Sequence, residues 1–231
     1  DGHSFLDIAY DKGAQAAVIA RESAALAPQK LMHWIVDDTL YAYQQLGLLH
    51  RLNLDIPVIA ITGSAGKTTT REIIRSAISS LGNVLSTIEN NNNDVGVPYT
   101  LLQGQDSHIA AVIEMGMRGL GEIRRLSFFS QPDIAVITNI GSAHIGRLGD
   151  RSEIAKAKCE ITSSLKSNGI LVIPANDPLL ERRVRENWNG RIIRVSINEK
   201  CKTKNYVQEN SFNESIPQAD LIGELDVAKG F

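Results

Sequence analysis

The chain has 231 residues, of which 43% are hydrophobic and 22% charged, and its formal net charge is −2 at pH 7. This is an ordinary globular composition with enough apolar residues for a sizeable core. The near-neutral charge gives no positive field that would attract nucleic acid or anionic lipid, so we expect neither as a partner.

The cysteine content and the lack of long apolar runs indicate a cytoplasmic protein. Cys159 and Cys201 are too few for a disulfide framework or a zinc site, and we expect reduced thiols. No apolar run approaches the length of a membrane span, and no signal peptide opens the sequence. The sequence opens without Met, which we interpret as the start of a fragment.

Residues 1–53 predict part of a small α/β domain. Phe5, Ile8 and Ala9 share one face of a helix that Gly13 ends. Short apolar strands are predicted next, and a helix completes the segment before a junction at Arg51–Asp55, within which the domain boundary falls between residues 53 and 54. The strands cover Ala16–Ala20 and His33–Val36, and the helix covers Asp38–Leu49.

From Ile56 the pattern changes to repeated strand–loop–helix units, which predict a doubly wound, mainly parallel α/β sheet of the P-loop type in residues 54–231. The continuously apolar strand Val58–Thr62 is typical of a parallel strand covered on both faces. Residues 198–231 fit either a hairpin region or a disordered tail. Further strands are predicted at Ile109–Ile113, Ile134–Thr138, Ile170–Ile173 and Ile192–Val195, and helices at Gly119–Phe128, Ser152–Leu165 and Pro178–Asn187.

The segment TGSAGKTT lies between that strand and an amphipathic helix, which is the setting of a phosphate-binding loop. Its glycines let backbone N–H groups turn toward phosphate oxygens, and the helix N-terminus adds partial positive charge. The spacing is shorter than the common form, because Ile61 stands where the first glycine is usual. We expect Lys67 to neutralise phosphates and Thr68 to reach Mg²⁺. The nucleotide site then comprises Gly63, Ser64, Ala65, Gly66, Lys67, Thr68 and Thr69.

Three further residues and one segment are candidates for the same edge of the sheet. Glu114 follows a predicted strand, where it fits a Mg²⁺ ligand and a surface or helix-capping carboxylate equally well. His144 follows another strand, although a lone histidine is more often structural. Lys158 lies on a helix, where a lysine is normally solvated. The run of Asn90 to Leu102 reads as a loop that turns at Gly96 and Pro98.

Taken together these segments resemble the Mur ligases. The shortened loop is followed in family order by NNNNDVGVPYTLL, EMGMRGLGEI, PDIAVITNIGSAH and IAKAKCEI. The opening DGHSFLDIAYDKGAQAAVI is similar to the end of the family's UDP-binding domain, and the resemblance covers about residues 1–178. Ala65 departs from the family, in which Asn or Ser is commoner at that position.

The resemblance implies an ADP-forming ligase that uses ATP and Mg²⁺ to make an amide bond through an acyl phosphate. EMG at Glu114 to Gly116 implies the member that adds D-Ala-D-Ala to UDP-N-acetylmuramoyl-tripeptide in peptidoglycan synthesis. The resemblance also implies that the metal ions are bound by Thr68, Glu114, His144 and a carbamylated Lys158. It implies catalytic roles for Lys67, His144 and Lys158. Asn92 and Asn93 would face the muramoyl substrate.

Two other interpretations stay open. A related ligase, such as a folylpolyglutamate synthase or a cyanophycin synthetase, would share the loop and the metal residues but lack the EMG and NNxxGxP combination. A nucleotide-binding regulatory module would share the loop alone. The family's adenine motif and third domain do not follow in this sequence, so we expect the isolated chain to lack ligase activity. We also expect a monomer.

Overall fold

The computed structural model describes residues 1–141, 143, 145–197 and 221–223. They form a seven-stranded sheet flanked by helices and a separate two-stranded lobe. Every strand pairing is parallel. The predicted fold class, a mainly parallel α/β sheet preceded by a smaller α/β unit, is confirmed.

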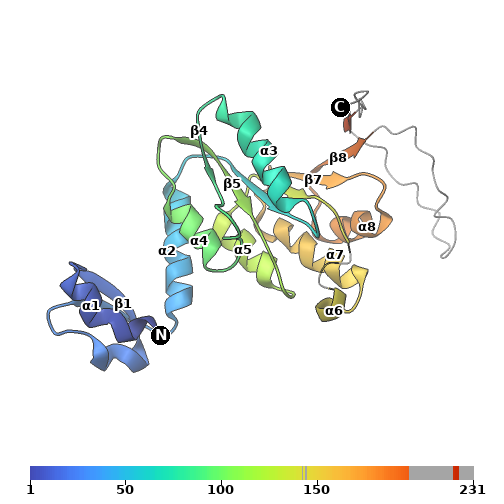
Figure 1. The fold of residues 1–231 in the computed structure, drawn as a ribbon. Coiled ribbons are helices and arrows are strands. Elements are labelled where there is room, and N and C mark those ends of the chain that lie inside the picture. Colours follow the sequence, from blue (N-terminus) through green and yellow to red (C-terminus); the bar gives the residue numbers. More distant parts are fainter. Residues whose placement is uncertain (142, 144, 198–220, 224–231) are drawn as a thin grey trace, which may run out of the picture.

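The first lobe has a small core of its own, made by Leu6, Ile19 and Leu31. It stands apart from the large sheet at one end of helix α2, Thr39–Asn53 (Figure 1). Asp38 begins that helix, because its carboxylate accepts the backbone N–H of Tyr41 at 2.9 Å. The lobe contains η1 Gly2–Phe5, α1 Leu6–Asp11, β1 Ala16–Ala20, η2 Arg21–Leu26 and β2 Met32–Val36.

The strand order of the large sheet is β4-β5-β3-β6-β7-β8-β9. The chain runs to one side of β3 for β4 and β5 and then crosses to the other side for β6 to β9. Such a reversal places the carboxyl ends of neighbouring strands around one crevice. The strands are β3 Val58–Thr62, β4 Asn83–Ser86, β5 His108–Glu114, β6 Ile134–Ile137, β7 Ile170–Pro174, β8 Arg191–Ile197 and β9 Leu221–Gly223.

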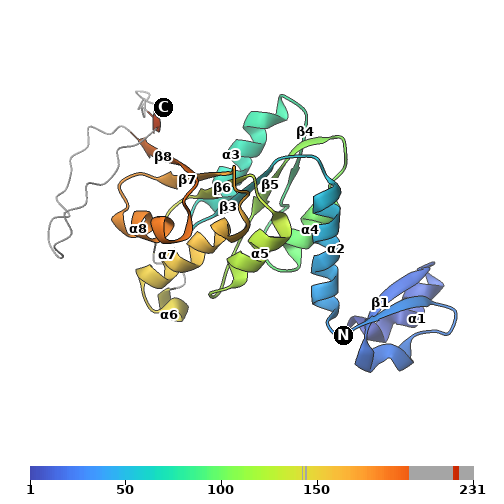
Figure 2. The same ribbon diagram turned by 180° about the vertical axis from the view of Figure 1, so that it is seen from behind.

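Helices cover the two faces of this sheet unequally (Figures 1 and 2). Helix α3 lies on one face, and the group α4, α5, α7 and α8 lies on the other, with α2 packed outside α4 and α5. The short α6 precedes α7. Their bounds are α3 Lys67–Ser79, α4 Gly96–Leu102, α5 Glu122–Ser130, α6 Ile145–Leu148, α7 Arg151–Cys159, η3 Glu160–Ser164 and α8 Pro178–Asn187.

The prediction of a loop throughout residues 90–102 is wrong, because Gly96–Leu102 form helix α4. Pro98 lies in the first helical turn, where a missing N–H breaks no helical hydrogen bond. A Cβ on Gly96 would come within 2.5 Å of the Asn91 backbone, which explains glycine at this position. Val97 and Leu101 are fully buried, so tertiary packing stabilises a short helix whose sequence reads as a turn.

Arg51 ties α2 to the base of the sheet. Its side chain is 5% exposed. It donates to the carbonyl oxygens of Ser130, Leu54 and Gln131 at 2.9, 3.0 and 3.1 Å. It also pairs with the Asp133 carboxylate at 3.2 Å. One cation therefore satisfies three backbone acceptors at the junction of two segments.

We expect Arg51→Met to lower the free energy of unfolding by about 3 kcal/mol or more, because buried acceptors and Asp133 lose their partner. Urea unfolding followed by circular dichroism measures the change. Arg21→Met is the control, since the Arg21–Asp37 pair at 2.9 Å is exposed and is expected to contribute about 0–1 kcal/mol. Equal losses in the two variants would contradict this role for Arg51.

Candidate nucleotide-binding site

The loop Gly63 to Thr69 joins β3 to α3, as the sequence predicts. A Cβ on Gly63 would overlap the Thr138 hydroxyl, so no side chain fits there. Gly66 adopts a left-handed conformation with φ of 76° as the residue preceding α3. Both glycines are thus required by geometry, and the loop ends at a helix N-terminus, where an anion is favoured.

Residues that follow β6 hold this loop from one side. The Asn139 side chain accepts the Ala65 N–H at 3.0 Å and donates to the Ala65 carbonyl oxygen at 3.0 Å. The Thr138 hydroxyl donates to the same carbonyl oxygen at 2.6 Å. Ser64 donates its N–H to the Asn139 carbonyl oxygen at 3.2 Å, and its hydroxyl accepts the Gly141 N–H at 2.9 Å. These contacts fix the loop against the neighbouring strand.

Lys67 and Thr68 open helix α3 and project from its first turn. The Lys67 ammonium donates to the Gly63 carbonyl oxygen at 3.0 Å, which bends the side chain back over the loop. The Thr68 hydroxyl donates to Oε2 of Glu114 at 3.0 Å. The two residues therefore bring a cation and a hydroxyl to the site that the sequence predicts for phosphates and a metal.

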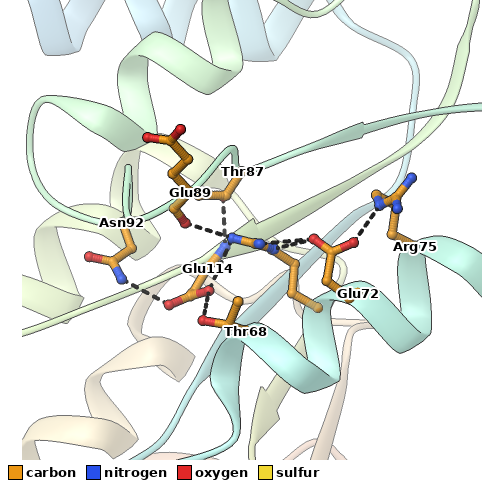
Figure 3. A network of polar contacts seen from close by, with 8 residues as sticks. Thr68, Glu72, Arg75, Thr87, Glu89, Asn92 and Glu114 are labelled. Carbon is orange, nitrogen blue, oxygen red and sulfur yellow. Dashed lines mark hydrogen bonds and ion pairs between the residues drawn. The ribbon is translucent and has the colours of Figure 1, made fainter.

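Glu114 ends β5 and is 1% exposed, so the alternative of a surface carboxylate is wrong. Asn92 donates its side-chain amide to Oε1 at 2.8 Å, and Thr87 accepts the Glu114 backbone N–H at 2.9 Å. Figure 3 shows the carboxylate between Thr68 and Asn92. Both carboxylate oxygens thus accept hydrogen bonds, which offsets the cost of burying this polar group.

Arg71 completes this network and was not predicted from the sequence. Its side chain is 5% exposed, and it pairs with Oε2 of Glu114 at 3.2 Å. It also donates to the carbonyl oxygen of Glu89 at 2.9 Å and pairs with Glu72 at 2.8 Å. The signal was its place four residues after Lys67, because residues i and i+4 share a helix face.

Of the two predicted substrate asparagines, Asn92 is half-buried against Glu114 and Asn93 is exposed. The Asn93 side-chain oxygen accepts the N–H groups of Val95 and Gly96 at 3.1 and 2.8 Å, so it stabilises the turn that leads into α4. Their contact with a substrate stays a prediction. His144, predicted as a catalytic residue and metal ligand, lies outside the described residues.

Lys158 is buried rather than solvated, with 1% of its surface exposed. Burial, and secondarily the positive charge of Lys67, lowers the pKa of its ammonium to about 7. Its neighbour Cys159 is a free thiol whose pKa burial raises to about 12, so it is not a reactive thiolate. Without the family resemblance, Lys158 would be interpreted as a solvated lysine on a helix surface. That interpretation is wrong.

Two wider features of the described part of the chain bear on its chemistry. None of its helices is long and apolar enough to cross a membrane. Its histidine, cysteine and acidic side chains do not gather in groups of three that could hold a metal ion unaided. A metal at Glu114 would therefore take further oxygen ligands, from Thr68, water or a bound phosphate, as Mg²⁺ commonly does.

Comparison with known proteins decides the family. A protein-family model described as the Mur ligase middle domain matches residues 61–225. The chain belongs to the Mur ligase family. The matched part of this Mur ligase begins at β3 and contains the whole loop and the Glu114 network.

Two curated relatives carry the name UDP-N-acetylmuramoyl-tripeptide–D-alanyl-D-alanine ligase. The one from Synechocystis is 42% identical over 193 residues, which is 84% of this chain and 42% of the relative. The one from Bacillus subtilis is 44% identical over 181 residues, which is 78% of this chain and 39% of the relative. The chain thus spans about two fifths of the length of these relatives.

A solved structure of MurF ligase from Thermotoga maritima in complex with ADP has the same fold. Its TM-score is 0.76 at 31% identity, with 84% of this chain and 44% of that chain covered. The alignment supports the fold class of this Mur ligase independently of its sequence motifs.

The buried ammonium of Lys158 predicts a pH dependence of stability. An unfolded lysine has a pKa of about 10.4, so between about pH 7 and pH 10 the unfolded state binds a proton that the folded state lacks. The free energy of unfolding should therefore rise with pH in this range. Lys158→Met should reduce that rise by up to about 1.4 kcal/mol per pH unit.

Urea unfolding at about pH 6, 7 and 9 measures this linkage. Lys156→Met is the matched control on the same helix, because Lys156 is exposed and pairs with Glu153 at 3.5 Å. The control should keep the pH dependence of the wild type. The same pH dependence in Lys158→Met and wild type would show that Lys158 does not titrate differently on folding.

Proposed function

We propose that this Mur ligase chain is the ATP-binding part of an enzyme that joins D-Ala-D-Ala to UDP-N-acetylmuramoyl-tripeptide. The products would be ADP, phosphate and a peptidoglycan precursor, made in the cytoplasm. The observation that carries the proposal is the hydrogen bond of 3.0 Å between the Thr68 hydroxyl, at the exposed start of α3, and the buried Glu114 carboxylate, directly beside the Lys67 loop. The two relatives with that name, at 42% and 44% identity, support the choice of substrates.

ATP would bind with its phosphates at the N-terminus of α3. Backbone N–H groups of the loop and the helix dipole favour negative charge at that position. Lys67, whose ammonium donates to a neutral carbonyl oxygen at 3.0 Å, would exchange that contact for phosphate oxygens. A charge-assisted hydrogen bond is stronger than the contact it replaces, so the exchange is favourable.

Thr68 and Glu114 fit a Mg²⁺ ion, because a hydroxyl and a carboxylate supply the hard oxygen ligands it prefers. His144 and Lys158 are the proposed residues for a second metal. A bound Mg²⁺ supplies positive charge that offsets the repulsion between a phosphate and a carboxylate. The residues of this chain would hold the metal and the phosphates in place while the carboxylate approaches.

The reaction needs two anions to meet. An oxygen of the peptide's terminal carboxylate would attack the γ-phosphorus of ATP, and ADP would leave with the electrons of the broken P–O bond. The amino group of D-Ala-D-Ala would then attack the carbonyl carbon of the acyl phosphate. Loss of phosphate and of the amine proton leaves the amide. The contribution of Lys67 is electrostatic, because it faces the negative charge of the transferred group.

Lys158 is the proposed site of carbamylation. Its amine must be neutral to react with CO₂, and burial together with the charge of Lys67 lowers its pKa to about 7. The product would be a carboxylate that supplies oxygen ligands from a position where an ammonium cannot. Asn92 and Asn93, at the end of the segment that contacts Glu114, are the proposed contacts with the muramoyl substrate.

We expect Lys67→Ala to weaken the binding of ADP to this chain by about a hundredfold, because it removes a charge-assisted contact with the phosphates. Isothermal titration calorimetry measures the affinity. Lys156→Ala, at an exposed lysine on α7, is the control and should bind as the wild type does. Equal affinity in Lys67→Ala and wild type would refute the role of Lys67.

The substrates are tested in a chimera in which residues 61–225 replace the matching segment of the Bacillus subtilis relative. We expect phosphate release that requires ATP, UDP-N-acetylmuramoyl-tripeptide and D-Ala-D-Ala together. Substituting Asn92 and Asn93 by Ala should raise the KM for the UDP-linked peptide by about tenfold, as expected for lost polar contacts. A folded chimera that hydrolyses ATP without either substrate would favour a nucleotide-binding regulatory module.

A further inference from the structure

We propose that Thr138 and Asn139 form a clamp that fixes the orientation of the Ala65–Gly66 peptide and thereby positions the phosphate loop for its ligand. The proposal rests on the proposed nucleotide site and deepens it. Neither residue was a candidate from the sequence, in which Thr138 ends a predicted strand and Asn139 follows it. We define the clamp as these two side chains and treat both as positioning residues.

The hydrogen bonds of the clamp converge on one residue of the loop. The Ala65 carbonyl oxygen accepts from the Thr138 hydroxyl at 2.6 Å and from the Asn139 amide at 3.0 Å. The Asn139 side-chain oxygen accepts the Ala65 N–H at 3.0 Å. A carbonyl that accepts two hydrogen bonds has both lone pairs engaged, so its direction is set by the clamp.

The loop sequence does not set that direction by itself. Gly66 has φ of 76°, but glycine populates positive and negative φ about equally, so the preceding peptide can turn over at a low energetic cost. Replacement of Gly66 by another residue would not help, because the left-handed conformation strains any side chain with a Cβ. The orientation of the Ala65–Gly66 peptide therefore has to be imposed from outside the loop.

The orientation matters because the two dipole ends of a peptide have opposite effects on an anion. The described peptide bonds contain no cis form, so the Ala65 C=O and the Gly66 N–H point in opposite directions. The clamp holds the Ala65 carbonyl toward the residues that follow β6. The Gly66 N–H therefore points away from β6, at the N-terminus of α3. A turned-over peptide would present a carbonyl oxygen to the phosphates and repel them.

The packing around Gly63 supports the same inference independently. A Cβ at Gly63 would overlap the Thr138 hydroxyl. The lack of a side chain at the first glycine of the motif therefore leaves the room that the Thr138 hydroxyl occupies. The close approach follows from the sheet, since β3 pairs with β6 and Thr62 is opposite Ile137. The residues that directly follow these two strands are therefore neighbours, and loop and clamp are complementary in shape.

The test uses the 231-residue chain with two probes, ADP and inorganic tripolyphosphate, because tripolyphosphate reports on the loop without any adenine contact. Calorimetry gives the dissociation constants in the absence of Mg²⁺. We expect Asn139→Ala to raise the dissociation constants of both probes by about tenfold or more, because hydrogen bonds that fix the loop are lost. Thr138→Val should raise them by about threefold or more for the same reason. Thr138→Ser keeps the hydroxyl and should restore affinity to within about twofold of wild type.

A purely structural role is distinguished by two further measurements. Thermal unfolding should show Asn139→Ala folded at the temperature of the titration. The amide signal of Gly66 in a ¹H–¹⁵N spectrum should shift on addition of tripolyphosphate to wild type and shift much less in Asn139→Ala. Asn53→Ala is the matched control, because the Asn53 amide donates to the Leu49 carbonyl oxygen at 3.0 Å at the exposed end of α2.

The outcomes separate the two proposals. If wild type binds both probes and Asn139→Ala and Thr138→Val bind them equally well, the clamp is refuted and the nucleotide site stands. If Thr138→Ser binds as weakly as Thr138→Val, the hydroxyl is not the positioning group and the proposal fails for Thr138. If wild type binds neither probe, the proposed nucleotide site itself is wrong.

Discussion

The central constraint in this structure is the parallel pairing of β3 between β5 and β6. Register aligns Ile61 with Glu114 on one side and Thr62 with Ile137 on the other. Because parallel strands end at the same edge, the loop after β3 meets a carboxylate from the end of β5 and a hydroxyl and an amide from the two residues that follow β6. The roles proposed for the phosphate loop, for Glu114 and for the Thr138–Asn139 clamp depend on this alignment of three strand ends.

The site balances charge over a short distance. Glu114 is almost fully buried, and it is compensated by Arg71, Thr68 and Asn92. On the other side two lysines lie close enough for the charge of Lys67 to lower the pKa of Lys158. A bound phosphate would relieve the repulsion between these lysines, whereas a metal would compete with Arg71 for the carboxylate. The arrangement is thus suited to bind an anion and a cation together.

Part of the site was predictable because it depends on short-range sequence patterns. A continuously apolar strand, two glycines and Lys67 before an amphipathic helix predict the phosphate loop, and the structure places these elements as expected. The α4 helix was missed, because its stability comes from the burial of Val97 and Leu101 rather than from helix propensity. Asn139 was missed because its partner Ala65 lies 74 residues away in the chain. The spacing of Arg71 from Lys67 places it on the same helix face, but it does not show that the partner is Glu114, which lies 43 residues away.

The sequence by itself determined the alternation of strands and helices apart from short elements such as β4 and α4, the position of the phosphate loop and the resemblance to the Mur ligases. These features follow from local periodicity, glycine conformation and motif order, which are encoded within a few neighbouring residues. The tertiary structure decided that Glu114 and Lys158 are buried and that Asn139 holds Ala65. Burial and long-range hydrogen bonds depend on which strands become neighbours, and local patterns do not contain that information.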